Sequence, residues 1–279
     1  MIIGNTIRER TNPVIIAHYL DLPSITIFSI ANRLATMTEQ LVSSIAYVFG
    51  PIFYKQVANN AEPSKVQALL YTIVSLYAFF SAIFFIPLVV MSKDIVALWI
   101  GISYSDINIL VAFLVLAFFE RVISNPIGTL LVANAQHQKI AYLAVIVAFI
   151  SITLSITLIN ISGLKGVVIA SALSSLIAGV GLLWLLNVET AISPWPIVKT
   201  FTILTFLYAS LFFLGDVILV QSNQTTWYSL LINSMLVFLV TLIFSWFLLL
   251  NIAAKQILLE QMNRLLEKVG VKSSFISKH

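Results

Sequence analysis

Four charged residues lie in stretches of the chain that are otherwise apolar. Arg33 and Glu39 fall within the segment 24–49, and Glu120 and Arg121 are neighbours within a second apolar stretch, 107–133. A charge at membrane depth is expensive, so it usually faces a cavity or a partner of opposite charge. Because adjacent residues on a helix point about 100° apart, Glu120 and Arg121 are not expected to satisfy each other alone. Arg33 or Glu39 is therefore a candidate partner.

Polar residues and a proline follow the second pair of charges. Pro126 should disturb the helix and free a backbone carbonyl, which Ser124, Asn125 or a water molecule could satisfy. A charged pair with such neighbours near the middle of an apolar stretch indicates a lined cavity. The alternative is a structural ion pair that locks two helices together, and the residues leave both interpretations open.

Other kinds of chemistry lack their usual signatures. The chain has no cysteine, which excludes disulfides and thiolate ligands, and its three histidines, His18, His137 and His279, are far apart. There is no glycine-rich phosphate loop, no His-Glu-x-x-His and no Gly-x-Ser-x-Gly. We therefore expect neither an enzyme nor a bound metal or cofactor, and no nucleic-acid partner.

The composition shows what kind of element must carry the four charges. Of the 279 residues, 60% are hydrophobic and only 9% are charged, whereas soluble domains carry about 25% charged residues. About 20 apolar residues are needed to cross the hydrocarbon as a helix, and six stretches meet this length: 66–91, 107–133, 140–159, 167–186, 198–220 and 227–250. With the more polar segment 24–49 as a further span, the sequence predicts an all-α, polytopic transmembrane bundle of about seven spans, covering 24–250.

The two ends of the chain have a different character. Residues 12–20 are apolar but too short to cross a bilayer, so 1–23 is expected to be a loop and the end of a truncated helix. In the tail, 251–279, an apolar helical stripe alternates with charged residues, which predicts an amphipathic helix on the membrane surface. The stripe is formed by Leu258, Met262, Leu265, Leu266 and Val269.

The basic residues predict the orientation of the bundle. Lys and Arg are enriched in cytoplasmic loops. If the tail is cytoplasmic, nine basic residues share its side, against two to four on the other. The nine are Lys55, Lys65, Lys139, Lys199, Lys255, Arg264, Lys268, Lys272 and Lys278.

Two segments resemble a known family. The run 13–34 is similar to a stretch in polysaccharide-biosynthesis flippases, where it is followed by a helix ending in proline, as at Pro51 here. The segment 125–139 resembles a second stretch of the same family, which belongs to the multidrug/oligosaccharidyl-lipid/polysaccharide exporter superfamily. Phe28 stands where tyrosine is common in that family, and Asp21 where glycine is common.

The resemblance implies a fold of two six-helix lobes around a central cavity, with two further helices in some members. On this reading the chain corresponds to the second lobe and those two helices, residues 12–20 end the seventh helix, and the first lobe is absent or is a separate chain. The implied function is to move a lipid-linked oligosaccharide across the bacterial inner membrane for cell-surface polysaccharides such as the lipopolysaccharide O-antigen. The substrate carries a diphosphate, which arginine can bind through two parallel hydrogen bonds. The candidate cavity residues are Arg33 and Arg121, then Arg8 and Arg10, with the acids Glu39 and Glu120.

Three alternatives remain open. A drug/cation antiporter of the same superfamily would use intramembrane acids for ion coupling, and Glu39 and Glu120 are available. A truncated fragment would not transport at all. A membrane oligosaccharide polymerase would need a large extramembrane loop, which the short connections between the predicted spans do not offer.

Overall fold

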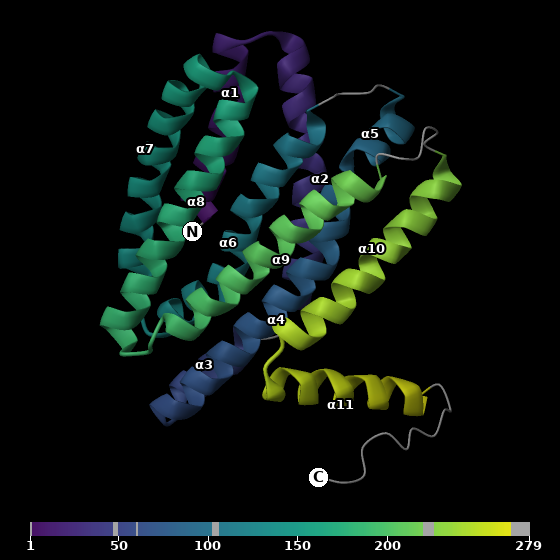
Figure 1. Cartoon of the computed structure of the whole chain (residues 1–279). Coiled ribbons are helices and arrows are strands. Elements are labelled where there is room, and N and C mark those ends of the chain that lie inside the picture. Colours follow the sequence, from purple (N-terminus) through teal and green to yellow (C-terminus); the bar gives the residue numbers. More distant parts are fainter. Residues whose placement is uncertain (1, 47–49, 60, 102–105, 220–225, 269–279) are drawn as a thin grey trace.

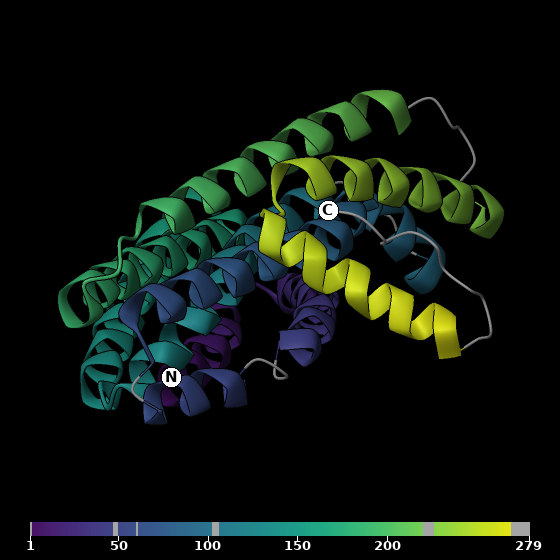
Figure 2. The ribbon, with the colours of Figure 1, turned by 90° about the horizontal axis from the view of Figure 1, so that it is seen from below.

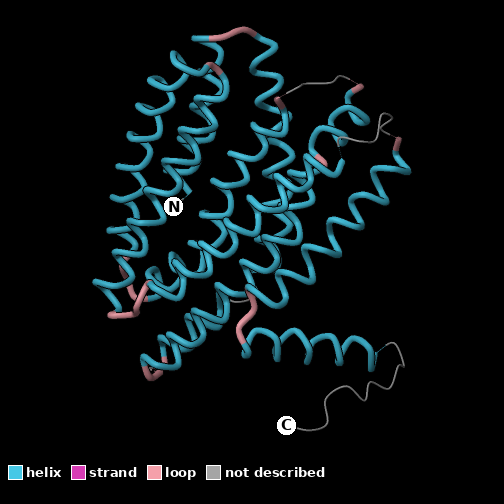
Figure 3. Tube along the Cα trace, viewed as in Figure 1, coloured by secondary structure: helices cyan, strands magenta, loops and turns pink. Residues whose placement is uncertain are grey.

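The computed structural model describes residues 2–46, 50–59, 61–101, 106–219 and 226–268, and this part of the chain folds into helices joined by short loops, with no strand (Figures 1 and 3). The helices are α1 (Ile2–Tyr19), α2 (Leu22–Ala46), α3 (Gly50–Ala58), α4 (Pro63–Val90), α5 (Ser92–Ile100), α6 (Ile107–Ala133), α7 (His137–Ser162), α8 (Leu164–Thr190), α9 (Trp195–Leu219), α10 (Trp227–Leu248) and α11 (Ile252–Lys268).

Six of the described helices are long and apolar enough to cross a membrane: α4, α6, α7, α8, α9 and α10. They coincide with the six apolar stretches of the sequence, which confirms the predicted all-α, polytopic bundle. Residues 24–46 of the weaker segment 24–49 belong to the 25-residue helix α2, but its polar residues keep it out of this apolar set. Among the described residues, six helices rather than the expected seven or so are therefore long and apolar enough to be spans.

The structure adds detail at three places between and before the long helices. The polar residues 92–94 lie between the apolar stretches 66–91 and 107–133 and begin the short helix α5. Only Gly163, whose backbone has a positive φ of 57°, separates α7 from α8. The segment 12–20, expected to be short, belongs to an 18-residue helix that begins at Ile2 and packs along α7.

The bundle has a buried centre and two outer sides. In the apolar windows of α4 and α6, 72% of residues are buried, against 17% in α10. Seen from below, α1, α2 and α3 lie on one side of this centre and α9 and α10 on the other (Figure 2). The exposed polar residues described below belong to α1 and α2, on the first of these sides.

Small residues let α8 approach α6 and α7 closely. A Cβ on Gly166 would lie 2.0 Å from the carbonyl oxygen of Leu158, and one on Gly179 would lie 2.8 Å from Oε1 of Glu120. Close approach of this kind is the usual role of small residues between membrane helices. Gly166 and Gly179 of α8 therefore serve close packing of the helices.

An aspartate holds the start of α2. Oδ1 of Asp21 accepts hydrogen bonds from the backbone N–H of Ser24 at 3.0 Å and from its hydroxyl at 2.5 Å. Such bonds satisfy a backbone donor that the first helical turn leaves free. The same bonds from Ser24 lower the pKa of Asp21 below its ordinary value. Asp21 thus has a local role in the turn from α1 to α2.

The last helix lies across the end of the bundle rather than along it (Figure 1). Oδ1 of Asn251 accepts a hydrogen bond from the N–H of Ala254, which caps the start of α11. Leu258 of the expected apolar stripe packs on a cluster with Leu76 and Phe79 of α4, whereas Met262 is 48% exposed. Leu265 and Leu266 belong to α11, and Val269 lies outside the described residues.

Candidate functional site

One face of α2 carries a row of polar side chains, which the exposed apolar residues Leu22 and Met37 interrupt. Thr26, Ser29, Arg33, Gln40 and Ser44 are all exposed, and their spacings of three, four or seven residues place them on one side of a helix. The hydroxyls of Thr26 and Ser44 donate to backbone carbonyls four residues earlier, at 3.2 and 2.7 Å. The other side of the helix is apolar and buried, so α2 is held by packing while its polar side stays open. The buried side includes Phe28, Ala31, Leu34, Ala35 and Val42.

Arg33 occupies the middle of this polar side. It lies eleven residues after Leu22, which is about 16 Å along the helix axis, close to half of the ~30 Å hydrocarbon thickness. A guanidinium facing lipid tails at that depth would be strongly unfavourable. If α2 crosses the membrane, as predicted from the sequence, its polar side is therefore expected to face water or another polar surface rather than lipid.

A second exposed arginine lies at a similar depth on α1. Arg10 is nine residues before Tyr19, about 14 Å from the end of α1 that turns into α2. The helices α1 and α2 lie on the same side of the bundle (Figure 2). Their exposed polar residues Arg10, Thr26, Ser29, Arg33 and Gln40 are here called the α1–α2 face. Arg8 belongs to α1, and its side chain lies outside the described part of the chain.

Arg121 is paired with an acid of α2. Its NH1 lies 3.4 Å from Oε2 of Glu39, and the two side chains are only 16% and 17% exposed. The guanidinium also lies over the ring of Phe118, 4.7 Å from the ring centroid, which adds a cation–π attraction. The partner expected for Arg121 among the acids of α2 is thus found, and the pair joins α2 to α6.

Glu120 points to a different part of the bundle. It is 6% exposed, and the hydroxyl of Ser124 donates to its Oε1 at 2.5 Å. Its side chain lies against Gly179 of α8 and borders an apolar cavity of about 340 Å³ between α6, α8 and α9. The expected divergence of Glu120 from Arg121 is confirmed, and Glu120 is remote from the α1–α2 face.

A buried polar cluster joins α1 to α7 and α8. Nδ2 of Asn12 donates to Oγ of Ser171 at 3.0 Å, and the hydroxyl of Ser155 donates to Oδ1 of Asn12 at 3.4 Å. Ser174 donates to Ser151 at 3.2 Å in the same region. Asn12 and the four serines are each less than 8% exposed, so the cluster serves to hold α1 in place.

The sequence predicted the charged residues but missed the polar face and the cluster. The polar face could have been found from the hydroxyl and amide side chains on either side of Arg33, which lie three, four or seven residues apart. The signal for the cluster was weaker. Serines at 151 and 155 share one helix face, but nothing local connects them to Asn12.

Known proteins were compared with this chain at the level of sequence and of structure. No family model matches the sequence, and no curated protein matches it. A solved structure of the lipid II flippase MurJ in an inward closed conformation is similar, with a TM-score of 0.61 and 18% sequence identity.

The similarity covers 86% of this chain and 51% of the MurJ chain, so the chain spans about half the length of that protein. At 18% identity the likeness shows the fold alone. It confirms the predicted fold class, a polytopic helical bundle like that of a lipid-linked substrate flippase. It does not extend to the polysaccharide-biosynthesis family named from the sequence.

Proposed function

We propose that this chain forms one lobe of a membrane flippase that moves a lipid-linked oligosaccharide across the bacterial inner membrane for cell-surface polysaccharide synthesis. The observation that carries the proposal is the α1–α2 face, which exposes two arginines and several neutral polar side chains on two neighbouring helices. Such a face suits a water-filled passage. The fold shared with a protein described as a lipid II flippase supports the same assignment.

The chemistry of the face fits a sugar diphosphate. A guanidinium binds phosphate oxygens through two parallel hydrogen bonds, and Arg10 and Arg33 lie at similar depths on neighbouring helices. Thr26, Ser29 and Gln40 offer neutral donors and acceptors for sugar hydroxyls. The lipid tail of such a substrate would stay in the bilayer, and the head group would move by rocking of two lobes around the passage. No bond of the substrate needs to break.

Arg121 has a different part in this proposal from the one suggested by its charge alone. Its guanidinium lies against Glu39 and Phe118, so it fixes the position of α2 against α6 rather than binding the substrate directly. Arg33 and Arg10 are then the substrate-binding candidates of this lobe.

A drug/cation antiporter has less support. Ion coupling would require an acid that can exchange its partner for a cation or a proton, and Glu39 and Glu120 are the intramembrane acids of the sequence-based hypothesis. Glu39 lies against Arg121, and Glu120 accepts a hydrogen bond from Ser124 inside the protein. Neither acid belongs to the exposed α1–α2 face.

Binding measurements in lipid nanodiscs test the proposal. The chain is titrated with a short-chain polyprenyl-diphosphate oligosaccharide, and native mass spectrometry counts the bound substrate. Arg33→Ala and Arg10→Ala should each weaken binding by about tenfold to a hundredfold, as expected for loss of one charge-assisted phosphate contact of about 1.5–3 kcal/mol.

Arg264→Ala is the matched control, because Arg264 is an exposed arginine of α11, outside the α1–α2 face. Its binding should stay at the wild-type level. If the Arg10→Ala/Arg33→Ala double variant also binds as the wild type does, the α1–α2 face is not the substrate surface and the proposal fails.

A further inference from the structure

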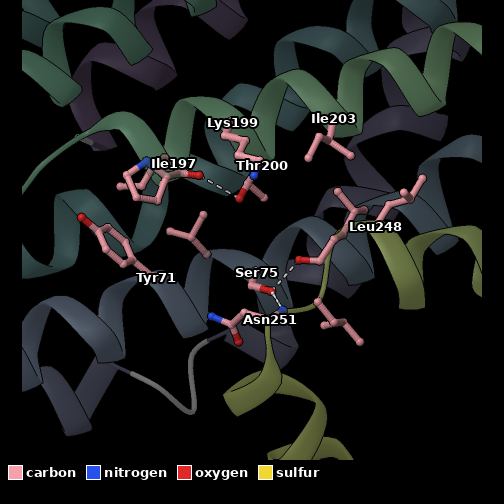
Figure 4. Close-up of a pocket in the computed structure, with 12 residues that line it drawn as sticks. Tyr71, Ser75, Ile197, Lys199, Thr200, Ile203, Leu248 and Asn251 are labelled. Carbon is pink, nitrogen blue, oxygen red and sulfur yellow. Dashed lines mark hydrogen bonds between the residues drawn. The ribbon is translucent and has the colours of Figure 1, made fainter.

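A pocket lies beside α4, where α9 begins and α10 ends, on the side of the bundle opposite the α1–α2 face. It has a volume of about 330 Å³ and is formed by residues of α4, of the first turns of α9, and of the segment that joins α10 to α11 (Figure 4). Ile197 is two residues from the start of α9, and Leu248 is the last residue of α10. The pocket is therefore at an end of the spans, at the depth of lipid head groups.

The walls of the pocket combine apolar surface with one positive charge. Val74, Ile203 and Leu248 supply apolar walls, and Lys199 stands on α9 beside Thr200 (Figure 4). Lys199 is exposed, and among the residues that the structure describes no acidic side chain forms an ion pair with it. An anion that enters the pocket would therefore meet one cation, Lys199, next to apolar walls.

The floor of the pocket is a fixed hydrogen-bonded joint. The hydroxyl of Ser75, which is 3% exposed, donates to the carbonyl of Leu249 at 2.6 Å and accepts from the N–H of Asn251 at 3.0 Å. At the rim, the hydroxyl of Tyr71 donates to the carbonyl of Ser193 at 2.8 Å. These hydrogen bonds tie α4 to the segment before α9 and to the segment between α10 and α11. The pocket is therefore formed by fixed backbone segments rather than by mobile side chains.

We propose that this pocket binds an anionic glycerophospholipid. The phosphate lies at Lys199, and an acyl chain follows Ile203 and Leu248 into the space between α9 and α10. The position favours a lipid over a soluble anion. Trp195, next to the pocket, is 70% exposed, and exposed tryptophan at a helix end marks the membrane interface. Lys255, near the start of the adjoining helix α11, lies at the same end of the bundle, and basic residues near a membrane surface attract anionic lipids.

Lipid retention in nanodiscs tests this proposal. The whole chain is reconstituted in phosphatidylcholine with increasing amounts of phosphatidylglycerol, and native mass spectrometry counts the phosphatidylglycerol molecules that remain bound. The wild type should retain one molecule in preference to phosphatidylcholine. Lys199→Gln should weaken this retention about fivefold, the effect expected for one basic residue at an anionic surface. Ile203→Trp, which fills the pocket without changing its charge, should weaken retention as well.

Lys65→Gln is the matched control, because Lys65 is an exposed lysine at the same end of the bundle that already pairs with Glu62 at 3.4 Å. It should retain phosphatidylglycerol like the wild type. Equal loss in Lys65→Gln and Lys199→Gln would mean diffuse surface attraction and would overturn the site. Unchanged retention in Lys199→Gln would overturn it too.

Two further measurements distinguish a bound lipid from a free anion and from a structural role of Lys199. Inorganic phosphate added to phosphatidylcholine nanodiscs should not raise the unfolding temperature, whereas phosphatidylglycerol should. If phosphate alone stabilises the wild type but not Lys199→Gln, the ligand is a free anion and the lipid assignment is wrong. In pure phosphatidylcholine, Lys199→Gln and the wild type should unfold at the same temperature. A lower value for the variant would assign Lys199 a structural role instead.

Discussion

Arg121 of α6 and Glu39 of α2 meet at 3.4 Å between NH1 and Oε2, although 82 residues separate them in the sequence. Both side chains are more than four-fifths buried. Burying one such charge without a partner costs much free energy, whereas burying the two as a pair costs far less. The pair therefore fixes where α2, the helix with the polar side, stands against the centre of the bundle.

Breaking the pair should destabilise the bundle. Arg121→Ala leaves Glu39 without this counter-charge, and the loss should be about 3 kcal/mol in the free energy of unfolding. The double variant Glu39→Gln/Arg121→Gln removes both charges and should recover part of that loss. Unfolding of the single and double variants in mixed micelles gives the coupling energy. A coupling energy near zero would mean that the two residues act independently.

Filling the space at Gly179 should disturb Glu120. A Cβ at Gly179 would lie 2.8 Å from Oε1 and 2.9 Å from Cγ of Glu120, so Gly179→Ala forces the carboxylate to move away from Ser124. Overpacking of this kind costs about 1–3 kcal/mol, measured as a lower unfolding temperature. Val180→Leu, at a neighbouring position that is 68% exposed, is the control and should have little effect. Equal stability of both variants would show that Glu120 moves freely.

Removing the amide of Asn12 should loosen α1. Asn12→Leu deprives Ser155 and Ser171 of their partner, and a hydrogen bond between membrane helices contributes about 0.6–1.7 kcal/mol. The expected result is weaker cross-linking between cysteines introduced into α1 and α7, measured against the cysteine pair alone. Val14→Ala, at a position on α1 that is 66% exposed, should leave the cross-linking unchanged. The same loss in both variants would contradict a role for the polar cluster.

The basic residues predict that α11 lies in the cytoplasm. Lys139, Lys199 and Lys255 sit at the α11 end of the bundle, whereas Lys165 sits at the other end. Reporter fusions after Gln224 and after His279 should report opposite sides of the membrane, with the second one cytoplasmic. An external signal from the fusion after His279 would reverse the proposed orientation.

The long apolar helices could be predicted from the sequence because their signal is local. The stretch 107–133 coincides with α6, since apolar length alone decides where a span lies. The short helices α3 and α5 were missed because each has only nine residues, too few to give a clear period. The helical character of residues 2–11 could not be predicted, because Arg8, Glu9 and Arg10 interrupt the apolar pattern that length-based prediction requires.

The site could be predicted only in part. Charge within an apolar segment identified Arg33, Glu39, Glu120 and Arg121 as unusual, and the 100° step between neighbours correctly separated Glu120 from Arg121. Which residues are exposed depends on how the helices pack, and this information is absent from the local pattern. Arg33 and Arg121 looked equivalent in the sequence, yet one is exposed and the other lies against Glu39.

The hydrogen bonds of Asn12 set an order of events during synthesis. Its partners Ser155 and Ser171 lie 143 and 159 residues later in the chain. At a translation rate of about 5–20 residues per second, α1 would leave the ribosome roughly 7–30 s before them. During that interval the amide of Asn12 lacks these two partners, and the insertion machinery or the membrane surface would have to supply others. Release of α1 into the bundle would then be timed by the arrival of α7 and α8, which makes the first described helix one of the last to reach its final place.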